Sequence, residues 1–247
     1  KVAFYISNLI GGGAERNFIN IINYFFSRGI NIDLILNNKI GQNLKYLDIG
    51  VNLYILNSNE SKYSIIELRQ YIDQYVPNII ISTLTHCNLA LLIASLLSHR
   101  TPKIVIREAN SFLEQRRNMG LLRLFYERLR TSILYRRANL ILVNSIGSRD
   151  QLSKATMIKK NNIVVLPNSV DINLIRSLAK QRIEPFINQF VKGKKVIVSV
   201  GRLVRNKDFS NLIKAFNRLK EKNIVLLILG EGNLEYQLQS LINRLNL

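Results

Sequence analysis

The chain has 247 residues, and its 47% apolar content is ample for a buried core, which excludes an intrinsically disordered protein. Its 35 Lys and Arg outnumber its 16 Asp and Glu, and the net charge of +19 predicts an anionic partner: a phosphorylated small molecule, an anionic membrane or nucleic acid. The longest apolar run, near Leu89–Leu97, is about half of the roughly 18 to 20 residues that a membrane-spanning helix requires, so no transmembrane segment is expected.

Short β-rich runs alternate with longer segments of helical apolar spacing through the first part of the chain. The predicted strands are Val2–Ile6, Ile32–Leu36, Asn52–Leu56, Asn78–Ser82, Lys103–Arg107, Leu140–Val143 and Ile163–Leu166. The predicted helices between them include Ala14–Ser27, Ser64–Tyr75, His86–Ser98 and Gly120–Ala138. Because the strands are continuously apolar, we expect an α/β fold with a parallel sheet that is covered by helices on both faces.

The pattern breaks after Pro167, and a new α/β unit begins near residue 190. Its predicted elements are the strand Lys195–Val200, the helix Asp208–Lys222, the strand Ile224–Leu229 and the helix Leu234–Leu245. We therefore predict a Rossmann-like domain over residues 1–170, a linker over 171–190 and the first part of a second Rossmann-like domain over 191–247. Two strands and two helices are too few to complete such a domain, so the second one is expected to be incomplete.

Cysteine and histidine are scarce, which limits the chemistry that the chain can support. The single Cys87 has no internal partner for a disulfide, and this favours a reducing cytoplasm. No spacing of Cys, His or carboxylate residues is typical of a metal site, and we expect none.

Two loops at strand ends are suited to anions. Residues 11–13 are three glycines that lead into a helix, where backbone N–H groups and the helix N-terminus attract phosphate, although glycine also serves simply to make a bend. In the second unit, Arg202 follows a strand and Lys207 lies at the mouth of a helix. A guanidinium and an ammonium group together suit a diphosphate. The alternative is a solvated basic loop in which a cation pairs with Asp208.

The order of the sequence blocks adds a resemblance to these local patterns. The blocks are GGGAER (residues 11–16), IREAN (106–110), VNSIGSRDQL (143–152), VVLPNSVD (164–171), VGRLVRNKDFSNLIKAF (200–216) and LLILGEG (226–232). In this order they resemble the family-4 retaining glycosyltransferases, also called group 1, over nearly the whole chain. The resemblance implies a GT-B-like arrangement of two Rossmann-like domains with parallel sheets.

That resemblance also implies a function. The expected activity is transfer of a sugar from a UDP- or GDP-linked donor to a glycan or lipid-linked acceptor in capsule, lipopolysaccharide or other polysaccharide biosynthesis, with no cofactor. Arg202 and Lys207 match the residues that grip the donor diphosphate, and Gly12 and Gly13 match a loop near the donor phosphates. Residues 230–232, which are Gly230, Glu231 and Gly232, match a turn that lines the donor side of the site or only shapes the bend.

Two further residues are candidates for catalytic contacts. His86 follows a predicted strand, and some relatives carry a His in this region that helps to hold the reacting sugar; a structural or helix-capping role is the alternative. Arg107 ends another predicted strand, where it is suited to an anionic acceptor, with an internal salt bridge as the alternative. Its neighbour Glu108 is suited to a basic partner.

The chain departs from the family pattern at two points. Ser169 stands where the family has the glycine of a PNG turn. The family's Glu-x7-Glu motif, which contacts the donor sugar and ribose, does not occur in the 247 residues, as expected of a C-terminally truncated chain. The alternative function is therefore a non-catalytic, truncated protein that binds phosphorylated ligands or membranes.

Residues 116–137 form the most basic stretch, with seven Arg, no Lys and one acid, Glu127. Leu121, Phe125, Leu129 and Ile133 recur at every fourth position on one helical stripe. Such a helix is suited to an anionic membrane surface, which favours a peripheral protein on the cytoplasmic face. The predicted lipid contacts are Arg116, Arg117, Arg123, Arg128 and Arg130. The alternative is a core-facing helix with a solvated basic face. No nucleic-acid motif accompanies the charge, so nucleic acid is not an expected partner.

Overall fold

A computed structural model describes residues 1–112, 116, 119–219, 221 and 223–247. The chain divides into two compact units, Lys1–Ile172 and Asn173–Leu247, which we describe separately.

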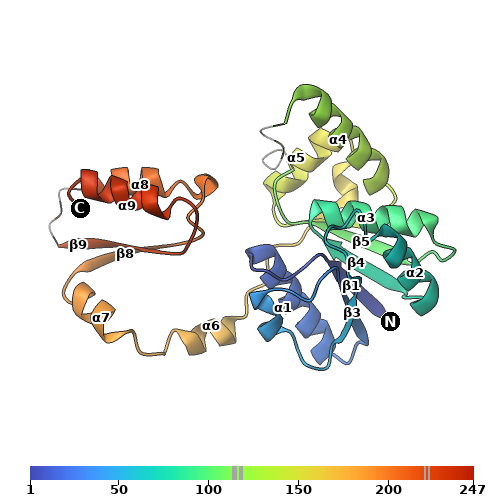
Figure 1. Ribbon diagram of the computed structural model, residues 1–247, viewed down its shortest axis with the longest axis horizontal. Coiled ribbons are helices and arrows are strands. Elements are labelled where there is room, and N and C mark those ends of the chain that lie inside the picture. The colour runs from blue at the N-terminus through green and yellow to red at the C-terminus, as the bar shows by residue number, and fades with distance from the viewer. Residues whose placement is uncertain (113–115, 117–118, 220, 222) are drawn as a thin grey trace. The chain divides into compact units, whose positions relative to one another are not determined.

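The first unit contains a seven-stranded sheet in the order β3-β2-β1-β4-β5-β6-β7, with every pair parallel (Figure 1). The strands are β1 (Val2–Ile6), β2 (Ile32–Leu36), β3 (Asn52–Ile55), β4 (Ile79–Thr83), β5 (Lys103–Glu108), β6 (Leu140–Val143) and β7 (Ile163–Val165). The α-helices described between them are α1 (Gly13–Ser27), α2 (Ile65–Tyr75), α3 (Thr85–Leu97), α4 (Leu121–Tyr135) and α5 (Ile146–Thr156). Short 3₁₀ turns occupy η1 (Gln42–Tyr46) and η3 (Lys160–Asn162).

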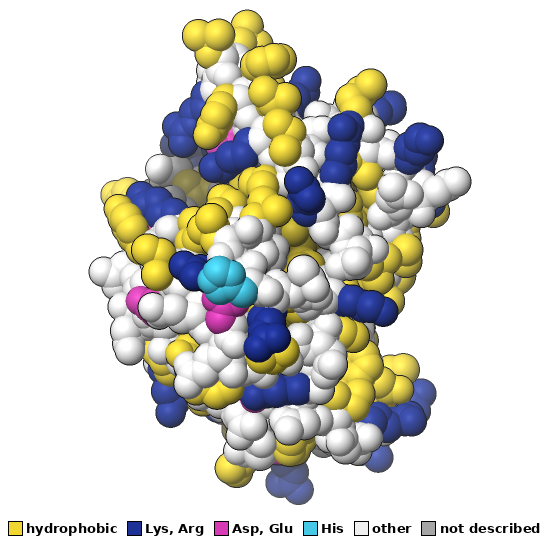
Figure 2. All heavy atoms as spheres, turned by 90° about the vertical axis from the view of Figure 1, so that its right-hand side faces the viewer, with side chains coloured by type: hydrophobic (Ala, Val, Ile, Leu, Met, Phe, Trp, Pro, Cys, Tyr) yellow, Lys and Arg dark blue, Asp and Glu magenta, His cyan; other side chains and the backbone are white. Residues whose placement is uncertain are grey.

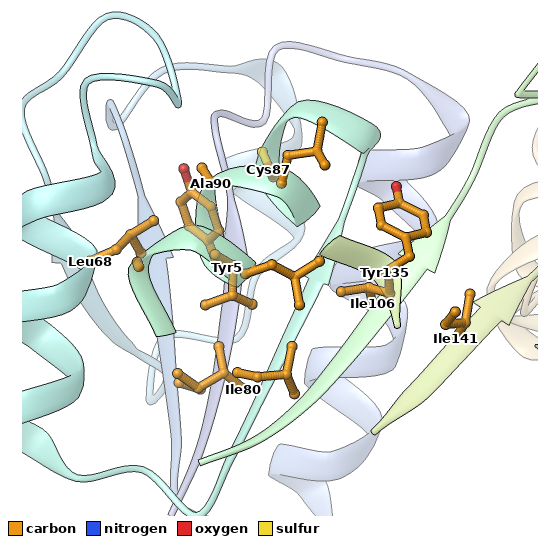
Figure 3. Close-up of a cluster of buried hydrophobic side chains, with 14 of the residues drawn as sticks. Tyr5, Leu68, Ile80, Cys87, Ala90, Ile106, Tyr135 and Ile141 are labelled. Carbon is orange, nitrogen blue, oxygen red and sulfur yellow. The ribbon is translucent and has the colours of Figure 1, made fainter. Parts of the chain in front are cut away.

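Alternate residues of each strand pack into two cores, one on each face of the sheet. Phe4 and Ile6 of β1 face α1, where they meet Phe18 and Ile22. Tyr5 faces the opposite core, which helices α2 to α5 cover. Figure 3 shows this second core, with strand and helix residues interleaved. Because both faces of the central strands are buried, apolar residues predominate on both faces and their sequences lack a two-residue alternation.

The expected parallel sheet with helices on both faces is confirmed. Each of the seven predicted strands lies within one residue of an observed one, and helix α4 is shorter than the predicted Gly120–Ala138. Helix α5 was not among the predicted helices. It begins where Ser145 accepts a hydrogen bond from the backbone N–H of Ser148, an N-cap that compensates for a polar sequence.

The second unit begins with two short helices, α6 (Ile172–Leu178, whose first residue closes the first unit) and α7 (Pro185–Val191), which ends one residue beyond the predicted linker 171–190. Parallel strands β8 (Lys195–Val200) and β9 (Ile224–Leu229) follow, with η4 (Arg205–Lys207), α8 (Phe209–Asn217) and α9 (Glu235–Arg244). A small core of Leu203, Phe209, Ile213 and Leu238 joins α8 and α9 to the sheet. The end of the predicted helix Asp208–Lys222 lies outside the described residues.

Two glycines of the second unit provide a matched test of its packing. Gly230 and Gly193 both have positive φ, at +155° and +74°. A Cβ atom at Gly230 would lie 1.9 Å from the carbonyl oxygen of Gly201, whereas one at Gly193 has no heavy atom within 4 Å. We expect Gly193→Ala to cost about 1 kcal/mol of unfolding free energy and Gly230→Ala about 2 kcal/mol more, because backbone must move. Hydrogen exchange of the β8 and β9 amides measures this, and equal loss of protection in both variants would contradict it.

Candidate functional site

The carboxyl ends of neighbouring strands gather polar side chains in the first unit. Strands β1, β4 and β5 lie side by side and run parallel, so the residues that follow them emerge at one edge of the sheet. Ser7 follows β1, Thr85 and His86 follow β4, and Arg107 and Glu108 end β5. The strand order reverses beside β1, and ligands bind at such reversals in open parallel sheets.

His86 lies in the first turn of α3 and is exposed. Its Nε2 lies 3.2 Å from Oγ of Ser7. Desolvation by the surrounding protein lowers the pKa of His86, and the nearby carboxylate of Glu15 opposes this only in part. The neutral ring can hydrogen-bond a hydroxyl group but brings no charge to a phosphate. Leu84 occupies the N-cap position of α3, so the capping alternative does not apply to His86.

Arg107 is enclosed, with 2% of its surface exposed. Its Nη2 donates a hydrogen bond to Oδ1 of Asn168 at 2.6 Å, and its Nε and Nη1 are buried without a hydrogen-bond partner in the described part of the chain. Burial lowers its pKa. The expectation that this guanidinium meets an anionic acceptor directly is corrected, because neighbouring atoms cover it. Arg107 instead holds the turn after β7 against the end of β5.

Glu108 is the centre of a buried hydrogen-bond network. Thr85 Oγ1 donates to its Oε1 at 2.6 Å, and the Tyr135 hydroxyl donates to its Oε2. Asn88 Nδ2 reaches both that hydroxyl, at 3.3 Å, and the Arg107 carbonyl, at 3.1 Å. Burial raises the pKa of Glu108 against the opposing effects of these hydrogen bonds and of Arg116. The network joins β5 to the start of α3 and the end of α4, and sequence reasoning missed the part played by Tyr135 and Asn88.

The glycine loop leads into α1 with Gly12 as the N-cap residue. A Cβ atom at Gly12 would lie 2.4 Å from Oε2 of Glu15, so this carboxylate folds back over the first turn and itself meets the positive end of the helix. A Cβ atom at Gly13 would have no heavy atom within 4 Å. The contact of Gly12 and Gly13 with donor phosphate stays a prediction.

The turn after β7 is fixed from two sides. Arg107 holds Asn168, and Asn17 of α1 donates from Nδ2 to both the carbonyl oxygen and Oγ of Ser169, at 3.2 and 2.8 Å. Ser169 does not have a positive φ. The turn therefore does not require the glycine that the family pattern carries.

The second unit presents its cations at the carboxyl end of β8. Arg202 and Lys207 are both exposed, and among the described residues neither has a carboxylate oxygen within 4.0 Å. The Lys207 stem passes over Gly201, where a Cβ atom would lie 3.8 Å from its Cδ, next to Arg202. Asp208 accepts a hydrogen bond from Ser210 Oγ at 3.3 Å instead of pairing with Lys207.

The turn over residues 230–232 is hydrogen-bonded to the loop that carries Arg202. Leu203 N–H donates to the carbonyl oxygen of Glu231 at 2.8 Å. Cβ atoms at Gly230 and Gly232 would lie 1.9 and 2.4 Å from the carbonyl oxygens of Gly201 and Leu203. Close packing of two backbones therefore accounts for both glycines, and the turn holds the Arg202 loop in place.

Helix α4 turns much of its apolar stripe outward. The exposed fractions are 85% for Leu121, 89% for Leu122, 67% for Phe125, 59% for Tyr126, 50% for Leu129 and 57% for Ile133. At about 100° per residue these side chains span an arc of about 140°. Figure 2 shows hydrophobic and basic side chains gathered at the top of the molecule, where Figure 1 places α4. The alternative of a stripe that faces the core is therefore wrong for these residues.

The arginines around α4 differ in their surroundings. Arg123 and Arg128 are exposed. Arg130 donates to Glu127 Oε2 at 2.8 Å. Arg116 is 4% exposed, donates to the Phe112 carbonyl oxygen at 3.0 Å and stacks on the Phe112 ring, so its assignment as a lipid contact is corrected. Arg117 lies outside the described residues.

A groove of about 420 Å³ lies over α3, beside His86. We call it the α3 groove, and its lining residues are Ser7, Asn8, Asn59, Glu60, Ser61, Lys62, Ile65, His86, Leu89, Ala90, Ile93 and Arg130. Over the described parts of the chain, no three His, Cys, Asp or Glu side chains are grouped to hold a metal ion. No helix in those parts has the length and hydropathy needed to cross a bilayer.

Comparison with known families assigns this architecture. Residues 11–174 match the model of "Glycosyltransferase Family 4", and residues 180–247 match "Glycosyl transferases group 1". The chain belongs to this glycosyltransferase family.

Individual relatives agree with the family assignment. One relative is a Campylobacter jejuni enzyme named N-acetylgalactosamine-N,N'-diacetylbacillosaminyl-diphospho-undecaprenol 4-alpha-N-acetylgalactosaminyltransferase. The chain is 30% identical to it, and the alignment covers 100% of this chain and 67% of that enzyme. It superposes with a TM-score of 0.74 on Anabaena HepE in complex with UDP-glucose, at 17% identity, covering 100% of this chain and 66% of HepE. The lipopolysaccharide outer core galactosyltransferase WaaB gives 0.66 at 19% identity, with 99% and 65% covered.

These comparisons confirm the expected α/β, GT-B-like fold and the family resemblance. The chain spans about two thirds of the length of these relatives, at 65% to 67%.

The raised pKa of Glu108 gives a prediction about stability. Burial favours the neutral carboxyl, so its contribution to folding is fully present below the ordinary carboxyl pKa and is lost as pH rises through the raised pKa. We expect the unfolding free energy of the wild type to fall relative to that of Glu108→Gln as pH rises from about 4, the ordinary carboxyl pKa, into the neutral range. Urea unfolding across this range measures the difference, with the exposed Glu60→Gln as control. If the unfolding free energy of the wild type instead rises relative to that of the Glu108→Gln variant as pH increases, the assignment of a raised pKa is contradicted.

Proposed function

We propose that this protein transfers a sugar from a nucleotide-sugar donor to a lipid-linked or glycan acceptor, with retention at the anomeric carbon. The observation that carries the donor half is the pair of exposed cations Arg202 and Lys207 beside the end of β8, for which the described residues provide no carboxylate within 4.0 Å. Ligands of open parallel sheets bind at this edge, and phosphate is the group that best matches a guanidinium beside an ammonium.

The chemistry asked of these cations is electrostatic. As the bond between the sugar and the diphosphate breaks, negative charge grows on the departing diphosphate, and Arg202 and Lys207 stabilise it. A nucleoside diphosphate is already a good leaving group, so no separate general acid is required. Neutral His86 of the first unit is suited to hold a sugar hydroxyl, because it offers a hydrogen bond without a charge.

The relatives support the choice of substrates. HepE has been seen with UDP and with UDP-glucose, which favours UDP over GDP as the donor nucleotide. The name of the Campylobacter enzyme specifies a diphospho-undecaprenol acceptor, which favours a lipid-linked acceptor over a free glycan. Surface polysaccharide or lipopolysaccharide biosynthesis at the cytoplasmic face of a membrane is the corresponding process.

The alternative, a non-catalytic protein that binds phosphorylated ligands, predicts the same binding without transfer. Incubation of the 247-residue chain with UDP-sugars and lipid-linked acceptors distinguishes the two. Sugar transfer would eliminate the alternative. Tight UDP binding without transfer would support it for this length of chain.

Donor binding tests the diphosphate site directly. We expect Arg202→Ala and Lys207→Ala each to weaken UDP binding about tenfold to a hundredfold, because each removes a charge-assisted hydrogen bond. Isothermal titration calorimetry measures the affinity. Lys214→Ala, which removes an exposed cation from α8, is the control and should leave it unchanged. If both site variants bind UDP as the wild type does, the assignment of this site fails.

We also propose that α4 lies on an anionic membrane. Its exposed apolar arc is bordered by Arg128 on one side and by Arg123 and Arg130 on the other, at about 100° per residue. This is the pattern of an interfacial helix, whose apolar face enters the acyl boundary while guanidinium groups meet lipid phosphates. The net charge of +19 adds attraction to an anionic surface.

Vesicle flotation tests this surface. We expect the wild type to float with vesicles that contain anionic lipid, and a Leu122→Asp/Phe125→Asp double variant to lose binding about tenfold or more, because two apolar side chains that would enter the lipid become charged. Ile49→Asp, at a position that is 101% exposed and remote in sequence from α4, is the control. Equal flotation of the double variant and the control would eliminate α4 as the contact.

A further inference from the structure

The floor of the α3 groove follows one face of a helix. His86, Leu89, Ala90 and Ile93 have the spacing i, i+3, i+4, i+7, which places them in a row on α3. Seven residues of helix rise about 10 Å, so the groove is long enough for more than one chemical group of a ligand. One wall is the segment from Asn59 to Ile65 before and at the start of α2, and the other includes Arg130 of α4.

The chemistry of the groove changes along this row. At the His86 end the side chains are polar, with Ser7 and Asn8 beside the imidazole. Further along α3 the floor is apolar, formed by Leu89, Ala90 and Ile93. A ligand that fits both ends has a hydroxylated part and an apolar part.

Two cations line the groove, Lys62 before the start of α2 and Arg130 of α4. Lys62 pairs with Glu60 at 3.0 Å, but both side chains are about 60% exposed, and such surface pairs are weak. Arg130 shares the single carboxylate of Glu127 with Arg116, at 2.8 and 3.8 Å. Two guanidinium groups on one carboxylate leave an excess positive charge. Arg130 Nε is also without a hydrogen-bond partner among the described residues.

Arg130 joins the groove to the exposed face of α4. It lines the α3 groove and its guanidinium lies 5.7 Å from the centre of the Tyr126 ring, whose residue belongs to the apolar arc. A molecule bound at Arg130 is therefore next to the surface that we propose lies on the membrane.

We propose that the α3 groove binds an amphiphilic acceptor through its phosphate, with Lys62 and Arg130 as the phosphate contacts. In this arrangement the sugar hydroxyl that receives the new sugar lies toward His86, and the lipid chain leaves past Tyr126 into the membrane under α4. The inference rests on the proposed function and deepens it, since it states which residues recognise the acceptor. It also assigns Arg130 to the acceptor phosphate, whereas Arg123 and Arg128 serve the bulk membrane.

Two sources of phosphate need to be separated: a lipid-linked diphosphate and a water-soluble one. The first probe is a neutral phosphatidylcholine vesicle that contains a small fraction of a polyprenyl diphosphate sugar. The second is a phosphatidylcholine vesicle that contains enough phosphatidylglycerol to give the same total charge. We expect the wild type to bind the first about tenfold more strongly than the second. A soluble sugar diphosphate without the lipid chain should compete weakly.

Variants assign the contacts. Lys62→Ala/Arg130→Gln should remove the preference for the polyprenyl diphosphate, whereas Lys103→Ala, which removes an exposed cation at the amino end of β5, outside the groove and α4, should keep it. Thermal unfolding checks that each variant is folded. If Arg130→Gln disturbs α4 through Glu127, the single variant Lys62→Ala still provides the test, with an expected loss of several-fold.

The outcomes separate this inference from the proposed function. UDP binding by calorimetry should be the same in wild type, double variant and control, because the donor contacts lie in the second unit. A preference that survives in the double variant would overturn the groove as the acceptor site while leaving the donor site intact. If the soluble sugar diphosphate competes fully, the inference that the groove recognises the lipid chain of the acceptor is overturned. If the wild type does not bind UDP at all, the result counts against the proposed function instead.

Discussion

Parallel strand pairing is the constraint on which the first unit depends. In a parallel sheet every strand ends at the same edge, so residues that are far apart in sequence become neighbours without any further device. Ser7 and His86, 79 residues apart, lie within hydrogen-bonding distance for this reason. The connections that make pairing parallel are helices, and α3 provides both cover for the core and the floor of a groove. Fold and candidate site are therefore consequences of one arrangement.

The Glu108 network adds order that apolar packing does not supply. Leucine and isoleucine side chains tolerate small shifts of a helix along the sheet, whereas a carboxylate with two hydroxyl donors fixes the distance and direction of each partner. Thr85 opens α3 and Tyr135 closes α4, so one buried acid positions both the helix that forms the floor of the α3 groove and the helix that carries Arg130. The cost is a desolvated carboxyl, which is visible in its raised pKa.

Strand positions could be predicted from the sequence because buried parallel strands are marked by continuous apolar runs such as Val2–Ile6. The second-unit cations could also be found, since Arg202 and Lys207 follow a strand within a recognisable motif. The burial of individual polar residues could not be predicted from the sequence. Arg107 and Arg116 have the same local pattern as exposed arginines, and their enclosure depends on Asn168, Phe112 and Glu127, which the fold brings to them. The α3 groove was missed because its walls come from three separate segments.

The Ser169 turn changes how a departure from a family pattern is understood. Read as a single position, serine in place of glycine is a loss of backbone freedom. In the structure Ser169 does not need that freedom. Its Oγ and its carbonyl oxygen both accept hydrogen bonds from Nδ2 of Asn17, in the helix that follows the glycine loop. Glycine would retain only the carbonyl contact. Asn17 and Ser169 therefore form a pair, and the effect of substituting either residue by its counterpart in a relative depends on which residue occupies the other position.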